Sequence, residues 1–292
     1  RPAPLIEHDF PDPDVIASDG RFFLYSSNSV YDGRLFHLPV VAARTLTGPY
    51  TEPVDAMPTL PDWVATPEQG GPNVWAPEIV ALPGNRYLLY FTAKHAVTGV
   101  QAIGVAWAVS PFGPFIPAGE PLVLTPAEGD AIDAEVFTAP DSTRHLLYKN
   151  GRDISRVWRQ QLTPDGFGTE GARVQLMQSD RPEENGILEA LARMRPGRYL
   201  YSADRFDSDS GYFINYAVAP PGQELTGPYV KAEGQLVTSA MFRPDYHNPG
   251  HPAYLPGFLL MHAMRTENRD RPLFAFTLET TSADGPPILP PL

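Results

Sequence analysis

The chain has 292 residues, of which 42% are hydrophobic, so we expect a substantial buried core and little disorder. A formal net charge of −12 without any basic tract argues against nucleic acid as a partner, and no apolar stretch approaches the roughly 20 residues of a membrane-spanning helix. Cysteine is absent, which removes disulfides, thiol catalysis and cysteine-based zinc sites.

A β-hairpin pattern recurs five times. Each copy starts at a polar or acidic residue, runs through a short apolar stretch and a turn, and ends in an aromatic or β-branched stretch. The 34 prolines and 24 glycines also favour short strands joined by turns. The copies are "PDPDVIASDGRFFLYSS" from Pro11, "VWAPEIVALPGNRYLLYFTA" from Val74, "AIDAEVFTAPDSTRHLLYKN" from Ala131, "GILEALARMRPGRYLYSADR" from Gly186 and "NPGHPAYLPGFLLMHAMR" from Asn248. The expected turns are Asp19-Gly20, Gly84-Asn85, Asp141-Ser142, Pro196-Gly197 and Pro256-Gly257.

A third strand follows each hairpin, so the unit has three or four strands and repeats about every 55–65 residues. In three units this strand runs into Gly-Pro-Tyr or Gly-Pro-Phe, and residues 157–168 and 273–285 occupy the same slot in the other two. Five antiparallel units arranged radially make an all-β, five-bladed propeller, and we expect residues 1–292 to form one domain. The alternative is a β-sandwich of coincidental hairpins, which the regular third strand disfavours.

The blade openings carry residues suited to chemistry. The first strand of each blade lines the central channel of a propeller, so equivalent residues from distant parts of the sequence gather on the axis. Those residues here are Asp12, Trp75, Glu78, Asp133, Glu189 and His251. Gathered like charges raise one another's pKa, a cost found mainly at functional sites. Paired carboxylates beside an indole are typical of glycoside hydrolysis.

Each of these residues also has a structural interpretation. Asp12 before Pro13 can form a turn, Glu189 can be a surface charge, and Trp75 or His251 alone can belong to the core. Their equivalent positions in the repeat favour the functional interpretation. Asp14 and Glu135 are the alternatives to Asp12 and Asp133, since strand alternation puts residues two apart on the same side.

The ordered motifs resemble glycoside hydrolase family 43, the five-bladed propeller glycosidases. The matching stretches run from Asp12 to Leu278 and are "DPDVI", "WAPEIV", "GVAWAVSPFGPF", "AIDAEVF", "ILEA", "GHPAYL" and "RPLFAFTL". The resemblance implies an active site in the central channel. It implies that Asp12 is the general base, Asp133 the acid that tunes and orients the proton donor, and Glu189 the general acid.

The resemblance also implies secondary roles. Trp75 and Glu78 at the second blade opening, with Arg271 in "RPLF", are expected to bind substrate. His251 is similar to an axial histidine that lies near a structural Ca²⁺ in the channel, largely through water. No cofactor is expected for the chemistry itself.

One motif departs from the family. The proton-donor motif usually reads Glu-Gly-Pro or Glu-Ala-Pro, and here it is Glu-Ala-Leu from Glu189 to Leu191. The missing proline can alter backbone rigidity and the aim of the acid, and Glu183 or Glu184 just upstream is the alternative donor.

The resemblance implies an inverting glycosidase that acts on arabinose- or xylose-containing oligo- or polysaccharides, first an α-L-arabinofuranosidase or arabinanase. The alternatives are a β-xylosidase, a galactan-acting enzyme, a non-catalytic carbohydrate-binding propeller and, least favoured, a protein-interaction propeller. The Asn-Asp-x-Asn-Gly opening of retaining fructan-cleaving propellers is missing. We expect a monomer that is secreted, with an upstream signal peptide before Arg1, or else cytoplasmic.

Overall fold

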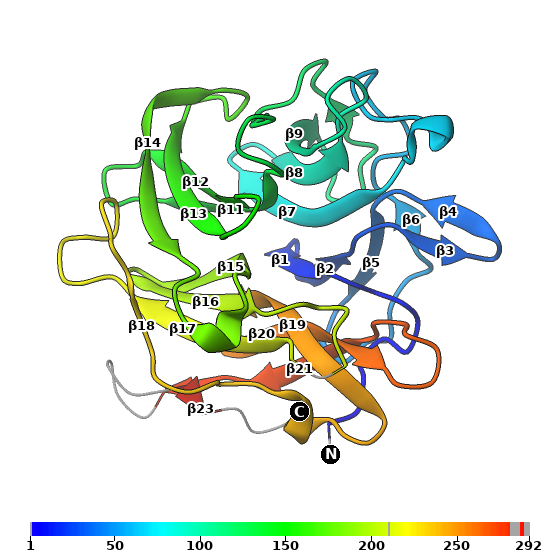
Figure 1. The fold of residues 1–292 in the computed structure, drawn as a ribbon. Coiled ribbons are helices and arrows are strands. Elements are labelled where there is room, and N and C mark those ends of the chain that lie inside the picture. Colours follow the sequence, from blue (N-terminus) through cyan, green and yellow to red (C-terminus); the bar gives the residue numbers. More distant parts are fainter. Residues whose placement is uncertain (1, 210, 281–286, 289–292) are drawn as a thin grey trace.

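Five antiparallel sheets surround a central channel in the computed structural model, which describes residues 2–209, 211–280 and 287–288 (Figure 1). This confirms the predicted all-β five-bladed propeller. The prediction for the third strand of the last unit covers residues 273–285, of which residues 281–285 lie outside the described residues.

In each sheet the strands follow one another from the channel outward. Blade 1 contains β1 (Asp14–Ser18), β2 (Arg21–Tyr25), β5 (Pro39–Ala43) and β6 (Val54–Asp55). Blade 2 contains β7 (Val74–Leu82), β8 (Arg86–Lys94), β9 (Gln101–Ala108) and β10 (Ile116–Pro117). Blade 3 contains β11 (Ile132–Thr138), β12 (Arg144–Asn150), β13 (Arg156–Leu162) and β14 (Thr169–Gln178). Blade 4 contains β15 (Leu188–Arg195), β16 (Arg198–Ala203), β17 (Phe213–Val218) and β18 (Val230–Lys231). Blade 5 contains β19 (Tyr246–Leu255), β20 (Phe258–Arg265) and β21 (Leu273–Thr277).

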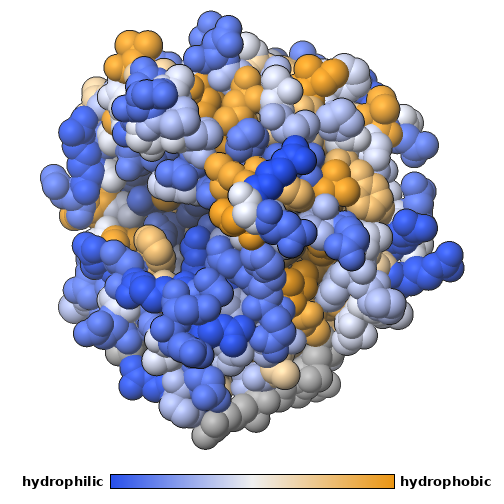
Figure 2. Space-filling view, turned by 90° about the vertical axis from the view of Figure 1, so that its right-hand side faces the viewer, coloured by the Kyte–Doolittle hydropathy of each residue, from blue (hydrophilic) through white to orange (hydrophobic). Residues whose placement is uncertain are grey.

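Small elements decorate the ring. They are the hairpins β3 (Ser29–Tyr31) with β4 (Arg34–Phe36) and β22 (Glu279–Thr280) with β23 (Pro287–Ile288), and the 3₁₀ turns η1 (Pro67–Gln69), η2 (Pro182–Glu184) and η3 (Ser239–Met241). Figure 2 shows the side that carries β3 and β4, where hydrophilic and hydrophobic residues are interspersed. The described part of the chain has no helix with the length and apolar character to cross a membrane.

The five predicted hairpins form around the predicted turns. In the first of them, Asp19 and Gly20 adopt φ of 48° and 69°, and β1 pairs with β2 on either side. Positive φ at both central residues gives a turn whose twist matches that of the strands. The Gly84-Asn85 turn between β7 and β8 has the same signs, with φ of 78° and 53°.

The core is divided into five hydrophobic clusters, each formed between two neighbouring blades. Tyr25 and Phe91 belong to the cluster between blades 1 and 2, and Leu24 and Leu260 to the one between blades 1 and 5. The other three clusters lie between blades 2 and 3, 3 and 4, and 4 and 5. Every blade is therefore held by both neighbours, which fixes the inner strands around the channel.

The ring is closed by the N-terminal segment. The amides of Leu5 and Ile6 donate to the carbonyl of Leu273 in β21, and the Leu273 amide donates back to Ile6. The Phe10 amide then donates to the carbonyl of Arg271. Blade 5 thus gains its outer edge from the start of the chain, immediately before Asp12 enters the channel.

Candidate active site

Each blade opening contains a residue in the left-handed backbone region. In β7, β11, β15 and β19 it lies at a shift in the pairing with the second strand, and in blade 1 it precedes β1. The five residues, with φ between 48° and 58°, are Asp12, Ala76, Asp133, Ala190 and His251. This conformation costs a non-glycine residue roughly 1–2 kcal/mol, so five repetitions indicate a requirement of the fold.

This register refines the predicted equivalence by one residue. Asp12, Asp133 and His251 are equivalent, as predicted, whereas Trp75 and Glu189 come one residue earlier in their blades. All five still line one cavity of about 210 Å³, which we call the mouth cavity. Its lining is Asp12, Trp75, Ala76, Ile132, Asp133, Glu189, Phe206, Tyr212, His251, His262 and Arg271.

Asp12 is held as a carboxylate at this cavity. Ser27 Oγ donates to its Oδ2 over 2.5 Å, and Arg271 Nη1 donates to Oδ1 over 3.2 Å. Burial alone would raise the pKa of Asp12. The Arg271 guanidinium, the two neighbouring imidazoles and the Ser27 hydroxyl outweigh burial and hold the pKa well below its usual range.

The two imidazoles beside Asp12 are buried. His262 Nδ1 accepts the Asp12 backbone N–H over 3.0 Å, so the ring proton sits on Nε2. Burial lowers the pKa of His262 to about 3, and burial also lowers the pKa of His251. Both rings are therefore neutral near pH 7, where Arg271 supplies the positive charge that faces Asp12. The imidazoles act on Asp12 by charge only at low pH, where they are protonated.

Glu189 has the opposite character. Burial raises the pKa of its carboxyl group, and the charge of Asp12 adds to this, against the nearby Lys149 ammonium and a hydrogen bond from Tyr212. Tyr212 Oη donates to Oε1 over 3.0 Å, and Lys149 Nζ lies 3.9 Å from Oε2. One cavity thus contains a carboxylate that stays ionised and a carboxyl group biased toward keeping its proton.

Asp133 is the third acid that lines this cavity. Burial raises its pKa well above the usual range, and the charges of Glu189 and Asp12 raise it further. Its Oδ2 accepts the backbone N–H of Ala190 over 3.0 Å, which fixes the chain next to Glu189.

The chain that forms this site is similar to known proteins. The sequence model of the family described as "Glycosyl hydrolases family 43" matches residues 2–270. The chain belongs to this family. It is therefore a glycosidase that hydrolyses O-glycosyl bonds.

Similar proteins include enzymes of several specificities. A curated "Xylosidase/arabinosidase 43A" from Humicola insolens is 31% identical over 123 residues, which are 37% of this chain and 36% of that protein. The chain thus aligns with about a third of the length of that relative. An endo-1,4-β-xylanase structure from Bacteroides thetaiotaomicron has a TM-score of 0.78 at 19% identity, covering 100% of this chain and 97% of the other. An α-L-arabinofuranosidase structure from Lactobacillus brevis has a TM-score of 0.77 at 20% identity, covering 98% and 95%. The structural matches show the propeller fold.

The sequence patterns missed three residues that line the mouth cavity of this family 43 enzyme, namely Phe206, Tyr212 and His262. They also missed Lys149, whose ammonium lies beside Glu189. Phe206 lines the cavity from the loop between β16 and β17, with the Arg271 guanidinium 5.6 Å from its ring centre. Tyr212 packs against Gly250, where an added Cβ would lie 1.8 Å from the Tyr212 ring. The one available signal was register, since Lys149 and His262 pair with Ile132 and Gly250 at blade openings.

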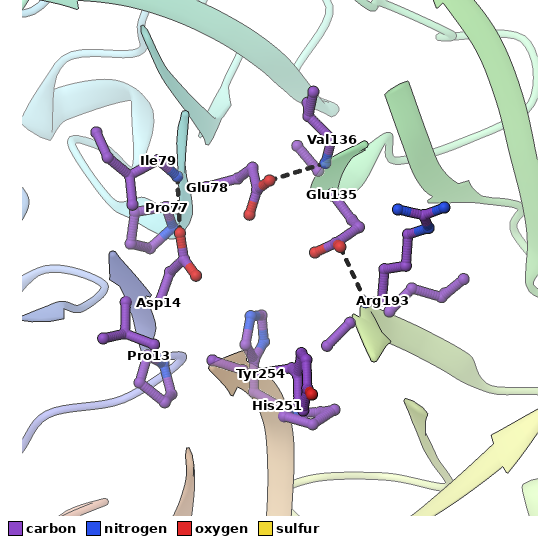
Figure 3. Close-up of a pocket in the computed structure, with 16 residues that line it drawn as sticks. Pro13, Asp14, Pro77, Glu78, Ile79, Glu135, Val136, Arg193, His251 and Tyr254 are labelled. Carbon is purple, nitrogen blue, oxygen red and sulfur yellow. Dashed lines mark hydrogen bonds between the residues drawn. The ribbon is translucent and has the colours of Figure 1, made fainter. Parts of the chain in front are cut away.

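Glu78 does not line the mouth cavity, which corrects its predicted place beside Trp75, and its substrate-binding role stays a prediction. It lines a second cavity of about 190 Å³ further along the channel, which we call the deep cavity (Figure 3). There Asp14, Glu78 and Glu135 point into the same space. Each carboxylate accepts a backbone N–H from the next blade: that of Ile79, Val136 and Arg193 respectively. These acids join neighbouring blades, which supports the structural interpretation of Asp14 and Glu135.

The family's missing proline leaves the backbone at Glu189 unchanged. Leu191 occupies the place that proline takes after the left-handed residue in blades 1, 2 and 5, and Ala190 still adopts φ of 51°. Glu184 is buried against Lys231 at 2.7 Å and Glu183 is exposed, and neither lines the mouth cavity. The geometry therefore keeps Glu189 as the acid at this site.

The calcium implied by the resemblance is tested by the surroundings of His251. Its Nδ1 lies 3.6 Å from Asp12 Oδ1, and its ring lies near His262. Within the described ranges no group of three or more histidine, aspartate or glutamate side chains is arranged to hold a metal ion. Calcium prefers six to eight oxygen ligands, so these side chains alone do not supply a calcium site, and a calcium held near His251 largely through water stays a prediction.

Proposed function

We propose that this enzyme removes terminal α-L-arabinofuranosyl residues from plant oligo- or polysaccharides, with inversion at the anomeric carbon. The observation that carries this proposal is the contrast between Asp12 and Glu189 in one cavity. Environments that push the pKa values of two carboxyl groups apart assign the base and the acid.

In this mechanism the substrate's glycosidic oxygen lies near Glu189 and a water molecule lies on the opposite face of the sugar, near Asp12. Asp12 takes a proton from the water as its oxygen bonds to the anomeric carbon. The bond to the leaving oxygen breaks as Glu189 donates its proton to it. Asp12 ends protonated and Glu189 ends as a carboxylate, and exchange with solvent restores both.

Asp133 supports the acid half of this reaction. Its hydrogen bond from the Ala190 amide fixes the backbone beside Glu189. Its buried carboxyl group also shares the space around Glu189, so any charge on Asp133 would make Glu189 hold its proton more tightly. We assign Asp133 to tuning and orienting the proton donor.

The size of the mouth cavity supports action on a chain end. Its volume of about 210 Å³ corresponds to roughly seven water molecules at about 30 Å³ each, which suits one sugar ring. Trp75, Ile132 and Phe206 supply apolar surface for that ring, and Arg271 reaches Asp12 from the rim.

The second candidate is β-xylosidase activity. It is favoured by the curated relative from Humicola insolens, which is named for both xylosidase and arabinosidase action. Both reactions use the same two carboxyl groups, so the proposed machinery serves either sugar.

The test is hydrolysis of 4-nitrophenyl α-L-arabinofuranoside and 4-nitrophenyl β-D-xyloside, followed by arabinan and xylan digests. We expect release of single arabinose units whose first-formed anomer, observed by proton NMR, is inverted. Glu189→Gln should remove turnover of the oligosaccharides while the melting temperature stays near that of the parent. Full activity of Glu189→Gln, or release of a retained anomer, would overturn the proposal.

A further inference from the structure

One blade breaks a hydrogen-bonding rule that the other four obey. In blades 1, 2 and 4 a hydroxyl oxygen accepts the N–H of the left-handed residue in the next blade, and in blade 5 the acceptor is His262 Nδ1. The bonds are Ser27 Oγ to Ala76 at 2.8 Å, Thr92 Oγ1 to Asp133 at 3.3 Å, Ser202 Oγ to His251 at 2.9 Å and His262 Nδ1 to Asp12 at 3.0 Å.

The equivalent residue of blade 3 is Lys149, since it pairs with Ile132 as Thr92 pairs with Trp75 and Ser202 with Glu189. An ammonium group has no lone pair and cannot accept the N–H of Ala190. That N–H donates to Asp133 Oδ2 instead. The exception occurs at the blade boundary that carries Glu189.

The Lys149 side chain lies near Glu189 and does not accept a backbone N–H as the equivalent residues do. It is 13% exposed and the Glu189 side chain is 15% exposed, and Lys149 Nζ lies 3.9 Å from Glu189 Oε2. Charged and titratable groups face Glu189 from every side of this space: Lys149 from β12, Asp133 from β11, Tyr212 from the loop before β17 and Asp12 from blade 1. Lys149 is the cation among these four.

We propose that Lys149 is a positioning residue for the proton donor, and that its ammonium group and Asp133 together replace the hydroxyl link found in blades 1, 2 and 4. This inference rests on the proposed role of Glu189. Asp133 takes over the backbone bond, which frees Lys149 to face Glu189. The ammonium then stabilises the carboxylate that Glu189 becomes once its proton has moved to the leaving oxygen.

This arrangement makes Glu189 a stronger acid than burial alone would allow. Burial raises the pKa of Glu189 and of Asp133, and Lys149 opposes the rise in both. Without the cation, Glu189 would keep its proton to higher pH and give it up less readily. The rate of hydrolysis would fall most for substrates whose leaving groups need a proton.

The experiment compares Lys149→Met, which removes the charge at similar length, with Lys149→Arg, which keeps it. The matched control is Lys94→Met, because Lys94 ends the second strand of blade 2 and its ammonium donates to the carbonyl of Gln69. Rates are measured against pH on an arabino-oligosaccharide, whose leaving sugar needs protonation, and on 4-nitrophenyl α-L-arabinofuranoside, whose leaving group does not.

For Lys149→Met we expect kcat to fall at least about tenfold more on the oligosaccharide than on the aryl glycoside, and the alkaline limb of kcat/KM to move up by about one pH unit. Lys149→Arg should keep most of the parent's kcat on the oligosaccharide and most of the parent's alkaline limb of kcat/KM. Lys94→Met should change neither the kcat nor the alkaline limb. An unmoved alkaline limb and an equal loss on both substrates would overturn the inference, since a merely structural lysine predicts that result.

Glu189→Gln separates this inference from the proposed function. If Glu189→Gln keeps its activity, the acid assignment fails and the role of Lys149 fails with it. If Glu189→Gln is inactive on the oligosaccharide and Lys149→Met behaves like the parent, only the inference about Lys149 fails.

A stability measurement needs no substrate. The melting temperature of Lys149→Met should fall further below that of the parent as pH rises through the raised pKa of Glu189, because the uncompensated Glu189 resists ionisation. This widening should shrink in a Glu189→Gln background. A gap between Lys149→Met and parent that is equal at all pH values would contradict the proposal.

Discussion

The mouth cavity and the deep cavity are two ends of one channel, and each holds three carboxyl groups, from blades 1, 3 and 4 at the mouth and from blades 1, 2 and 3 in the deep cavity. At the mouth, Asp12 faces Arg271 and Glu189 faces Lys149. In the deep cavity, Asp14 and Glu78 accept backbone N–H groups and have no ion-pair partner among the described residues. Equivalent placement in the repeat brings acids together at both ends. Arg193 lines the deep cavity and its charge lowers the pKa of Glu135, but among the described residues ion pairs with these acids occur at the mouth, where they favour separate roles for an acid and a base.

The largest expected effect separates Asp12 from Asp14. Asp12→Asn removes the base and should lower the rate by about 10²–10⁴-fold, the usual contribution of a general acid or base. Asp14→Asn keeps an oxygen that can accept the Ile79 N–H and should retain most of the activity. Steady-state kinetics with a melting curve for each variant check this. A larger loss of activity in Asp14→Asn than in Asp12→Asn would place the base in the deep cavity and contradict the assignment of the mouth as the active site.

A smaller effect is expected from the tyrosines of the two cavities. Tyr212→Phe removes the hydrogen bond to Glu189, and a bond to an ionisable group contributes about 1.5–3 kcal/mol, so kcat/KM should fall by roughly 10–100-fold. Tyr254 lines the deep cavity, so Tyr254→Phe should leave kcat/KM near the parent value. If both variants lose activity equally, the two cavities do not act independently.

The pH dependence of stability tests the deep cavity. Burial raises the pKa of Asp14 to about 7 and that of Glu135 to about 8, and the pKa of Glu78 rises well above its usual range through burial and the charges of both. The folded state therefore holds protons that the unfolded state releases above about pH 4, so these groups make the protein lose stability between about pH 4 and 8.

Glu78→Gln keeps an amide oxygen for the Val136 N–H and removes one ionisable group. It should be more stable than the parent at pH 8 and differ much less from it at pH 4, because the raised pKa of Glu78 costs stability only where the unfolded state would release the proton. Urea unfolding at both pH values measures this. A stability difference that does not change with pH would show that the deep acids are not coupled as described.

The smallest effect is expected at the rim of the mouth. Phe206 is 45% exposed and offers an aromatic face to a sugar. Phe206→Ala should raise KM by about 2–10-fold with little change in kcat, because aromatic contacts contribute roughly 0.5–1.5 kcal/mol. A loss confined to kcat would place Phe206 in the chemistry instead of in binding.

Most of the fold followed from local patterns. The turn at Asp19-Gly20 and the alternation in the strands around it specify a hairpin without reference to the rest of the chain. Five such hairpins at one spacing specify a ring, because each blade must bury both of its faces. The added edge from Leu5 and Ile6 was not visible, since it depends on pairing with Leu273 far along the sequence.

The site was harder to predict, because side-chain direction depends on the left-handed residue at each opening. The resemblance pointed to Asp12, Asp133 and Glu189, which the structure brings together in the mouth cavity. Glu78 was misplaced because a register shift separates it from Trp75, which turns the two side chains to different cavities. Tyr212 was missed because it lies in a loop and reaches Glu189 only through the packing of blades 4 and 5 against each other.

The ring closes between blades 1 and 5, where Leu5 pairs with Leu273, and we call this junction the seam. Blades contact only their neighbours, so we expect separation under heat or force to start between blades 1 and 5, the neighbouring pair that is not consecutive along the chain. Asp12 is held across that seam by Arg271 and His262, whereas Glu189 and its lysine lie between blades 3 and 4, away from it. On heating, the enzyme should therefore lose the position of its base before that of its acid. It should become inactive while most of its blades are still folded.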